Sequence, residues 1–132
     1  LVGYPIVHLV HPDLHRFVRC LEAALIEALE IFSVPSGRIE GLTGVWAGGK
    51  KIASIGVGVR RWVTYHGFAV NVSNDLLKFM QLRPCGFDGS VMTSLSAVAG
   101  RRMDLDDFKK KLLIRFEEVL QTRLEQKQPS AL

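Results

Sequence analysis

The sequence has few cysteines and no long apolar run. Two of its 132 residues are cysteine, Cys20 and Cys85, which are too few for the disulfide framework of a small secreted domain. No apolar run approaches the ~20 residues that span a bilayer, and no basic-then-apolar leader precedes a small-residue cleavage site. We therefore expect a soluble chain with free thiols and no membrane contact, located in the cytoplasm or, in a eukaryote, in an organelle matrix.

Phosphate-binding signatures are also missing. The sequence contains neither a GxxxxGK[ST] loop nor a GxGxxG fingerprint, which argues against the familiar kinds of nucleotide chemistry. Lysine and arginine outnumber the acidic residues, giving a formal charge of +4, and this favours acidic partners. The basic residues are scattered, however, and no aromatic side chains interleave with them as in a stacking platform. Nucleic acid is therefore not an expected partner.

Three histidines near the start of the chain suggest a metal site, because imidazole is a good zinc ligand. They are His8, His11 and His15, and Pro12 would break any helix that carried all three. No fourth ligand is obvious nearby. We expect neither a metal site nor a cofactor.

What is present is an ordinary globular composition, with 48% hydrophobic and 23% charged residues. Apolar residues recur every three or four positions from 14 to 32, after a possible cap at Asp13, and this predicts a helix. Segments 42–47 and 50–59 flank Gly48-Gly49, which is a strong hairpin signal, and a third strand is expected over 62–72. This order predicts an α+β domain with a mixed, largely antiparallel sheet flanked by helices.

The remaining segments complete a single domain over residues 1–132. Residues 1–10 should be extended, and residues 74–82 should form a short helical turn with Leu76, Leu77, Phe79 and Met80 facing inward. A last helix should begin at Asp104 and bury Leu105, Phe108, Leu112, Phe116, Val119 and Leu120. Residues 126–132 should fray.

Cys85 is the first candidate for chemistry. Its neighbours Pro84 and Gly86 predict a tight turn in which backbone amides could approach the sulfur and serve an oxyanion. The alternative is an inert, half-buried cysteine, since free cysteine usually behaves as a small hydrophobe. That second interpretation is the stronger one for Cys20, which lies within the first helix.

Lys51 and His66 are further candidates. Period-two counting places Lys51 on the apolar face of Ala53, Ile55, Val57 and Val59, where desolvation would disfavour its charged form and suit a general acid or base. A lysine that snorkels at the strand end is the alternative. His66 would share a face with Thr64, Phe68 and Val70, and could either pair with Cys85 or be a core histidine. Gly67 interrupts the strand, which suggests that another group approaches its backbone.

Taken together, four motifs resemble those of the lipoyl(octanoyl) transferases. They are residues 41–46 (GLTGVW), 50–57 (KKIASIGV), 66–72 (HGFAVNV) and 84–86 (PCG), in this order and with family-like spacing. Residues 93–95 (TSL) are also similar to the family, so that the resemblance covers about residues 1–96.

The resemblance implies a fold and a reaction. It implies the fold of biotin and lipoate protein ligases, and transfer of an octanoyl group from acyl carrier protein to a lysine of a lipoyl domain through a thioester on Cys85. Lys51 matches the lysine that assists this thiol. The acyl-binding segments match Ser54, Ile55 and Gly56 and also Gly67, Phe68 and Ala69, with His66 beside them. The implied partners are octanoyl-acyl carrier protein and the lipoyl domains of 2-oxoacid dehydrogenases and of the glycine cleavage protein.

One departure from the family concerns the start of the chain. The family has a glycine-rich block, RGG followed by THGPGQ-like residues, upstream of the segment matched by residues 1–5, and this block is absent here. We therefore expect the sequence to be the carboxy-terminal part of a longer catalytic domain. Two alternatives stay open: a non-catalytic module that binds carrier domains, and an ATP-dependent lipoate or biotin ligase on the same fold.

Overall fold

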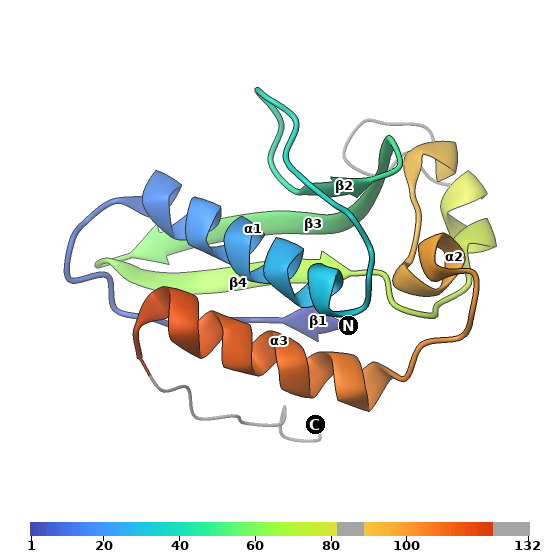
Figure 1. The fold of residues 1–132 in the computed structure, drawn as a ribbon. Coiled ribbons are helices and arrows are strands. Elements are labelled where there is room, and N and C mark those ends of the chain that lie inside the picture. Colours follow the sequence, from blue (N-terminus) through green and yellow to red (C-terminus); the bar gives the residue numbers. More distant parts are fainter. Residues whose placement is uncertain (82–88, 123–132) are drawn as a thin grey trace, which may run out of the picture.

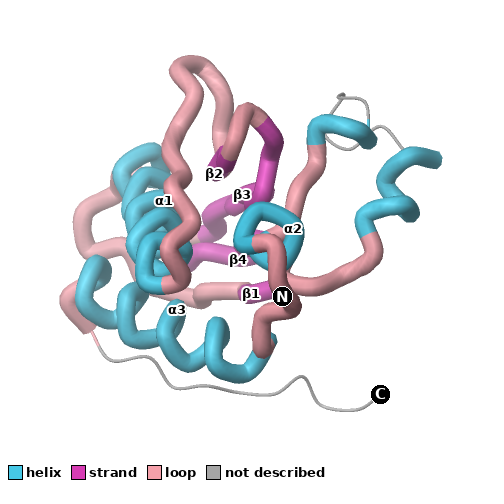
Figure 2. Tube along the Cα trace, turned by 45° about the vertical axis from the view of Figure 1, so that its right-hand side comes forward, coloured by secondary structure: helices cyan, strands magenta, loops and turns pink. Residues whose placement is uncertain are grey.

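The computed structural model describes residues 1–81 and 89–122 and has the predicted α+β architecture (Figure 1). The described elements, in chain order, are β1 (Val2–Gly3), α1 (Leu14–Ile31), β2 (Val45–Ala47), β3 (Lys50–Arg60), β4 (Val63–Val70), η1 (Leu76–Gln81), η3 (Gly89–Val91), α2 (Leu95–Ala99) and α3 (Leu105–Leu120). The four strands form an antiparallel sheet in the order β1-β4-β3-β2. Helices α1 and α3 pack together and cover one face of this sheet (Figure 2).

Helix α1 begins and packs as its sequence predicts. The side chain of Asp13 accepts a hydrogen bond from the Arg16 backbone N–H at 2.9 Å, which satisfies one of the free amides of the first turn. One helix face is buried against the sheet and α3, and it consists of Phe17, Leu21, Ala24, Leu25, Ala28 and Leu29. The three- and four-residue spacing of these side chains is what produces the continuous apolar face.

The two hairpins of the sheet have the same kind of turn. Gly48 and Gly49 have φ values of +57° and +77°, so the predicted glycine turn between β2 and β3 is confirmed. Arg61 and Trp62 also have positive φ, +50° and +60°, and they form the turn between β3 and β4. The third strand therefore begins at Val63 and not at the predicted Trp62, because these two residues are used to reverse the chain.

Helix α3 is capped as expected but buries fewer residues than predicted. Asp104 accepts from the Asp107 N–H at 2.7 Å, and Phe108, Leu112 and Phe116 are buried. Leu105 is 44% exposed, so its predicted burial is wrong, although Met103 before it and Phe108 after it both lie in the core. Val119 and Leu120 are half-buried against the core, whereas the predicted tail at 126–132 lies outside the described residues.

The helical turn after β4 is confirmed as η1, but its predicted inward packing is wrong. Leu77 is 74% and Met80 is 60% exposed, and no residue of η1 is buried. The reason is its place in the fold, since η1 contacts η3 at one end of the sheet, beyond the two long helices (Figure 1).

The extended segment at the start of the chain runs along the free edge of β4. Only Val2–Gly3 forms a strand, but the Val7 carbonyl accepts from Thr64 N–H at 2.9 Å and Leu9 N–H donates to the Trp62 carbonyl at 2.8 Å. The buried Thr64 hydroxyl joins the two segments further, because it donates to the Pro5 carbonyl at 2.7 Å and accepts from Val7 N–H at 2.8 Å. This segment thereby satisfies edge groups of β4 that would otherwise be open.

Candidate functional site

Lys51 lies at the start of β3 and is buried, with 5% of its surface exposed. Its ammonium nitrogen lies 5.4 Å from the centre of the Trp46 ring, close enough for a cation–π interaction. Gly44 borders its aliphatic stem, since a Cβ atom on Gly44 would lie 2.8 Å from Lys51 Cε. The predicted burial of Lys51 is confirmed, and the alternative of a snorkelling side chain at the strand end is overturned.

The strand alternation around Lys51 differs from simple period-two counting. Val45 pairs with Ala53 and Trp46 pairs with Lys51, so Ile52 is an additional residue on β3 and forms a bulge. As a result the adjacent residues Ile52 and Ala53 are both fully buried in the core. Lys51 pairs instead with Trp46, which lies outside the core cluster while its neighbours Val45 and Ala47 belong to it, so Lys51 does not share the predicted face of Ala53, Ile55, Val57 and Val59.

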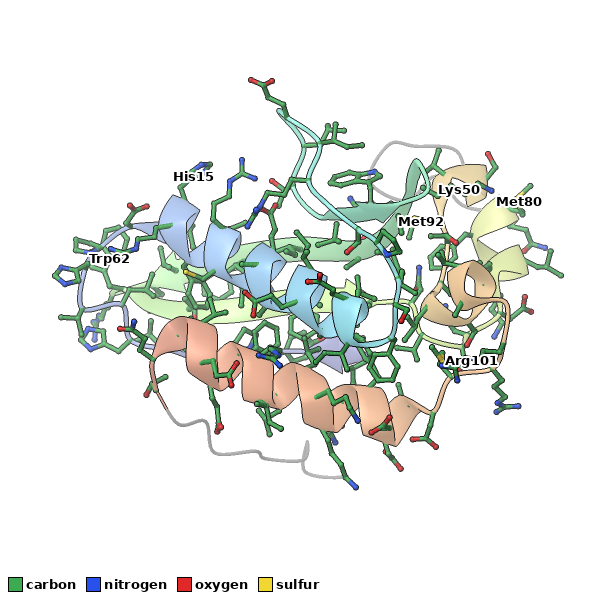
Figure 3. All side chains as sticks on the ribbon, viewed as in Figure 1. His15, Lys50, Trp62, Met80, Met92 and Arg101 are labelled. Carbon is green, nitrogen blue, oxygen red and sulfur yellow. The ribbon has the colours of Figure 1, made fainter. Side chains whose placement is uncertain are left out.

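The chain returns to Lys51 after the segment that contains the PCG motif. Met92 forms a parallel bridge with Lys51, and Thr93 N–H donates to the Lys51 carbonyl at 2.8 Å. Lys50 and Met92 lie at the same end of the molecule, with Trp62 at the other (Figure 3). Cys85 itself, with Pro84 and Gly86, lies outside the described residues.

Asn71 connects the end of β4 to the segment at Thr93, where the chain returns to Lys51, and the sequence alone did not predict this role. Its side-chain amide donates to the Thr93 carbonyl at 3.0 Å, and its side-chain oxygen accepts from the Asn74 amide at 3.1 Å. Its backbone N–H donates to the Ile52 carbonyl at 3.0 Å. The available signal was a polar residue between two valines, Val70 and Val72, that are both buried.

The two segments expected to bind the acyl chain lie directly opposite each other. Ser54 pairs with Ala69, Ile55 with Phe68 and Gly56 with Gly67, across β3 and β4. Phe68 is 6% exposed and packs on Phe116 with 5.1 Å between ring centres, and Ile55 packs against the same core. Alternation puts the small residues Ser54, Gly56 and Ala69 on the opposite face, away from the helices.

His66 does not share a face with Thr64, Phe68 and Val70, so this prediction and the core-histidine alternative are both wrong. Its φ of +60° turns the side chain out of the strand alternation, and His66 is exposed while the other three are buried. Its ring makes an edge contact with the Tyr65 ring at 4.9 Å.

The prediction that another group approaches the Gly67 backbone is confirmed, and that group is part of the same chain. A Cβ atom on Gly67 would lie 2.0 Å from the Gly3 carbonyl oxygen and 2.7 Å from Pro5 Cδ. Glycine is therefore required here for the start of the chain to pass along β4.

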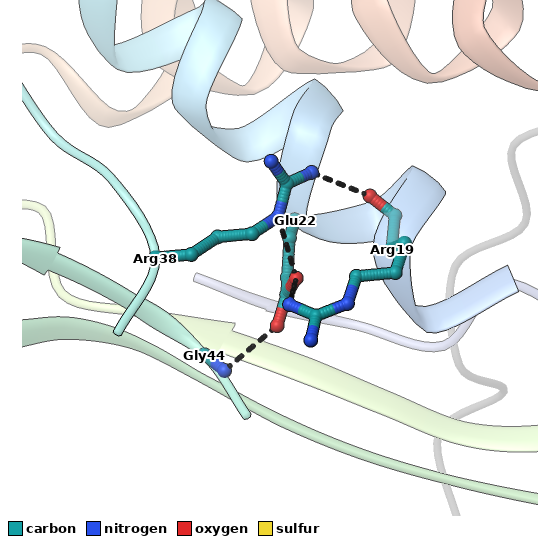
Figure 4. Close-up of polar contacts among 4 residues, drawn as sticks. All are labelled: Arg19, Glu22, Arg38 and Gly44. Carbon is teal, nitrogen blue, oxygen red and sulfur yellow. Dashed lines mark hydrogen bonds and ion pairs between the residues drawn. The ribbon is translucent and has the colours of Figure 1, made fainter. Parts of the chain in front are cut away.

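A second polar centre, also missed by sequence reasoning, lies between α1 and the loop before β2. Glu22 is 1% exposed, and its carboxylate accepts hydrogen bonds from Arg19, Arg38 and the Gly44 backbone (Figure 4). Its only signal in the sequence was an acidic residue next to the buried Leu21 in an otherwise apolar helix face.

The described residues hold no group of three or more His, Cys, Asp or Glu side chains that could bind a metal ion. Within the same part of the chain, no helix has both the length and the apolar character that crossing a bilayer requires.

The fold places the chain in a known structural class, that of the biotin and lipoate protein ligases. A crystal structure of lipoate-protein ligase A bound with ATP superposes with a TM-score of 0.71 at 18% identity, covering 96% of this chain and 52% of that one. Biotin protein ligase from Aquifex aeolicus gives a TM-score of 0.70 at 19% identity, covering 89% and 51%. The predicted fold is thus confirmed.

The family follows from the sequence match. Residues 1–117 match the lipoyl protein ligase A/B catalytic domain, and the chain belongs to this family. It is 49% identical over 126 residues to the octanoyltransferase of Geobacter metallireducens, covering 94% of this chain and 59% of that protein. It is 45% identical over 124 residues to a probable octanoyltransferase of Pyrobaculum calidifontis, covering 94% and 54%. The resemblance to octanoyltransferases is confirmed, and the chain spans somewhat over half the length of these relatives.

Proposed function

We propose that the protein transfers an octanoyl group from acyl carrier protein to a lysine of lipoyl domains, with Cys85 as nucleophile and Lys51 as its partner. The observation that carries this proposal is the buried ammonium of Lys51, beside which the chain returns at Met92, seven residues after Cys85. A buried cation beside a segment that carries a cysteine favours the thiolate, which is the reactive form of cysteine.

The proposed chemistry has two balanced steps. In the first, the Cys85 thiolate attacks the carbonyl carbon of the donor thioester, the acyl–sulfur bond of the donor breaks, and the carrier leaves as a thiol after the Lys51 ammonium gives it a proton, which leaves Lys51 neutral. In the second, the amine of the acceptor lysine attacks the thioester on Cys85, an amide forms, and the Cys85 thiolate is released. Lys51 in its neutral form accepts the proton that the amine loses. Neither step requires ATP or a metal ion.

We place the octanoyl chain on the small-residue face of β3 and β4. The single bulged residue between Lys51 and Ser54 shifts the alternation by one, which puts Lys51 on the side of Ser54, Gly56 and Ala69. Ser54 is three residues from Lys51, or about 10 Å along the strand, which is comparable to an extended eight-carbon chain. Ile55 and Phe68, on the other face of the same strands, would support this small-residue face from the core side.

Of the remaining predicted contacts, we place His66 at the far end of this face, whereas Gly67 is covered by Gly3 and Pro5 and contributes only its pairing with Gly56. Gly56 pairs with Gly67, so the exposed His66 lies one residue further from Lys51 along the sheet. His66 pairs with Val57, six residues or about 20 Å along the strand from Lys51. This separation favours Lys51 over His66 as the partner of Cys85.

The proposed partners are acidic carrier domains, namely octanoyl-acyl carrier protein as donor and, as acceptors, lipoyl domains of 2-oxoacid dehydrogenases and of the glycine cleavage protein. The formal charge of +4 supports their docking. We further propose that the reaction takes place in the cytoplasm or an organelle matrix, where Cys85 would stay reduced.

The second candidate function is an ATP-dependent lipoate or biotin ligase, because the fold also occurs in lipoate-protein ligase A bound with ATP. Such an enzyme would use ATP to convert the free acid into an acyl-adenylate, the acceptor lysine would attack this adenylate with release of AMP, and Cys85 would not be needed. The octanoyltransferase names of the more similar relatives favour the transferase.

The test is acylation of the full-length protein by octanoyl-acyl carrier protein, followed by intact-mass analysis. We expect one octanoyl adduct that hydroxylamine removes, that persists in Cys20→Ser, and that is absent in Cys85→Ser. Absence of the adduct in the wild-type protein would overturn the proposal. Product formation that depends on ATP and persists in Cys85→Ala would establish the ligase instead.

A further inference from the structure

Glu22 is a buried carboxylate for which the proposed reaction has no use. It lies on the face of α1 that packs against the core, next to Leu21 and near Leu25, both of which are fully buried. A charged carboxylate is unfavourable in such a place unless it is paired and hydrogen-bonded, and an apolar side chain would suit the packing. The contacts of Glu22 therefore indicate what it does in this fold.

Both oxygens of Glu22 are used, and they connect separate parts of the chain. Oε2 accepts from the Arg19 guanidinium and from Arg38 Nε, each at 2.8 Å. Oε1 accepts from the Gly44 backbone N–H at 3.1 Å. Arg38 also donates to the Arg19 carbonyl at 3.0 Å, which closes the network between α1 and the loop before β2 (Figure 4).

Gly44 is the link between this network and Lys51. Its φ is +135°, and a Cβ atom there would lie 2.7 Å from the Ala53 carbonyl oxygen and 2.8 Å from Lys51 Cε. The backbone of Gly44 therefore forms one wall of the space that holds the lysine stem. Two residues further on, the Trp46 ring faces the ammonium at 5.4 Å.

We propose that Glu22 is a positioning residue for Lys51. By accepting from Gly44 N–H while bound to two arginines, it fixes segment 44–46 against β3 and thereby sets where the Lys51 ammonium lies. Glu22 touches neither substrate nor the reacting atoms. This inference rests on the proposed Cys85–Lys51 pair, and the experiment separates the two.

The experiment measures how fast iodoacetamide alkylates Cys85 as a function of pH, using the full-length protein in a Cys20→Ser background. The midpoint of this profile reports how well Lys51 stabilises the thiolate. Lys51→Met should raise the midpoint. Glu22→Gln should raise it by about one pH unit, so that alkylation at pH values below both midpoints falls about tenfold, because the uncharged amide binds both arginines weakly and releases segment 44–46.

The matched control is Glu118→Gln. Glu118 forms an ion pair with Arg115 at the same three-residue spacing on a helix, at 2.7 Å, but this pair is exposed and far along the sequence from Lys51. Its substitution should leave the midpoint unchanged. If Glu22→Gln does not fold, Arg38→Gln provides the same test, because it removes one of the three donors from Glu22 at a position that is 40% exposed.

The outcomes are distinct. A higher midpoint in Glu22→Gln or Arg38→Gln, with Glu118→Gln at the wild-type value, supports the proposal. A wild-type midpoint in the folded Glu22 or Arg38 variant, together with a raised one in Lys51→Met, shows that Glu22 only stabilises the fold and overturns the inference. A wild-type midpoint in Lys51→Met overturns the proposed Cys85–Lys51 pair itself.

Discussion

Two glycines that face each other across β3 and β4 should respond to alanine in opposite ways. Gly56 and Gly67 are register partners, but a Cβ atom on Gly56 would meet nothing within 4 Å, whereas one on Gly67 would lie 2.0 Å from the Gly3 carbonyl oxygen. Because both residues lie in the same strand pair, intrinsic strand propensity affects them alike. The difference between the two variants therefore isolates the close approach at Gly67.

The magnitudes follow from these contacts. In Gly67→Ala the clash is with backbone, which cannot move away as a flexible side chain can, and overpacking of this kind costs about 1–3 kcal/mol. If the start of the chain separates from β4 instead, each lost hydrogen bond costs about 1 kcal/mol. We expect a total loss of about 2–4 kcal/mol. Gly56→Ala should change the free energy of unfolding by no more than about 1 kcal/mol, and in the stabilising direction, because alanine restricts the unfolded chain.

Urea unfolding of the full-length variants measures this difference in the free energy of unfolding, with the same denaturant slope expected for both.

Gly56→Ala should nevertheless slow octanoyl-adduct formation on Cys85 at least about tenfold, because its methyl group would project into the proposed acyl path; tenfold corresponds to about 1.4 kcal/mol. Equal stability of the two variants would refute the role of the close approach at Gly67. Unchanged acylation in Gly56→Ala would refute the placement of the acyl chain.

Three further predictions concern other parts of the molecule. Asn71→Leu should slow adduct formation and lower the free energy of unfolding in urea by about 1–3 kcal/mol, since it leaves the Thr93 carbonyl without its donor. An acylation rate equal to wild type would show that the contact between Asn71 and Thr93 is unimportant for the reaction. Asp104→Ala should cost about 1 kcal/mol through loss of the cap on α3, with acylation unaffected, and a cost near zero by the same unfolding assay would contradict the cap. Raising the salt concentration from low to physiological should slow transfer from acyl carrier protein, measured as initial rate, and a rate that is independent of salt would exclude docking by charge.

The elements of the fold were largely predictable, because their signals are local. Asp13 and Asp104 cap helices through bonds to amides three residues away, and Gly48-Gly49 forms its turn through its own backbone freedom. The strand limits were less predictable. The turn at Arg61-Trp62 uses left-handed backbone at residues that do not favour it, and the additional Ile52 on β3 depends on pairing with β2.

The residues of the candidate site likewise fall into those that the sequence predicts and those that only the structure shows. The motifs predict Lys51 and the two triplets at 54–56 and 67–69 as site residues from their order along the chain, because residue type and spacing suffice for a family resemblance. The outward turn of His66, the buried Glu22 and the role of Asn71 were not predictable, because each depends on groups distant in sequence.

By itself, then, the sequence determined which residues carry the family motifs, where helices begin and where the glycine hairpin turns, since these depend on chemistry within a few residues. The tertiary structure decided what surrounds those residues. It buried Lys51 between Gly44 and Trp46, brought Met92 beside it, and passed the start of the chain over Gly67. These contacts join residues that are distant along the chain, and only packing of the whole sheet and its helices specifies them.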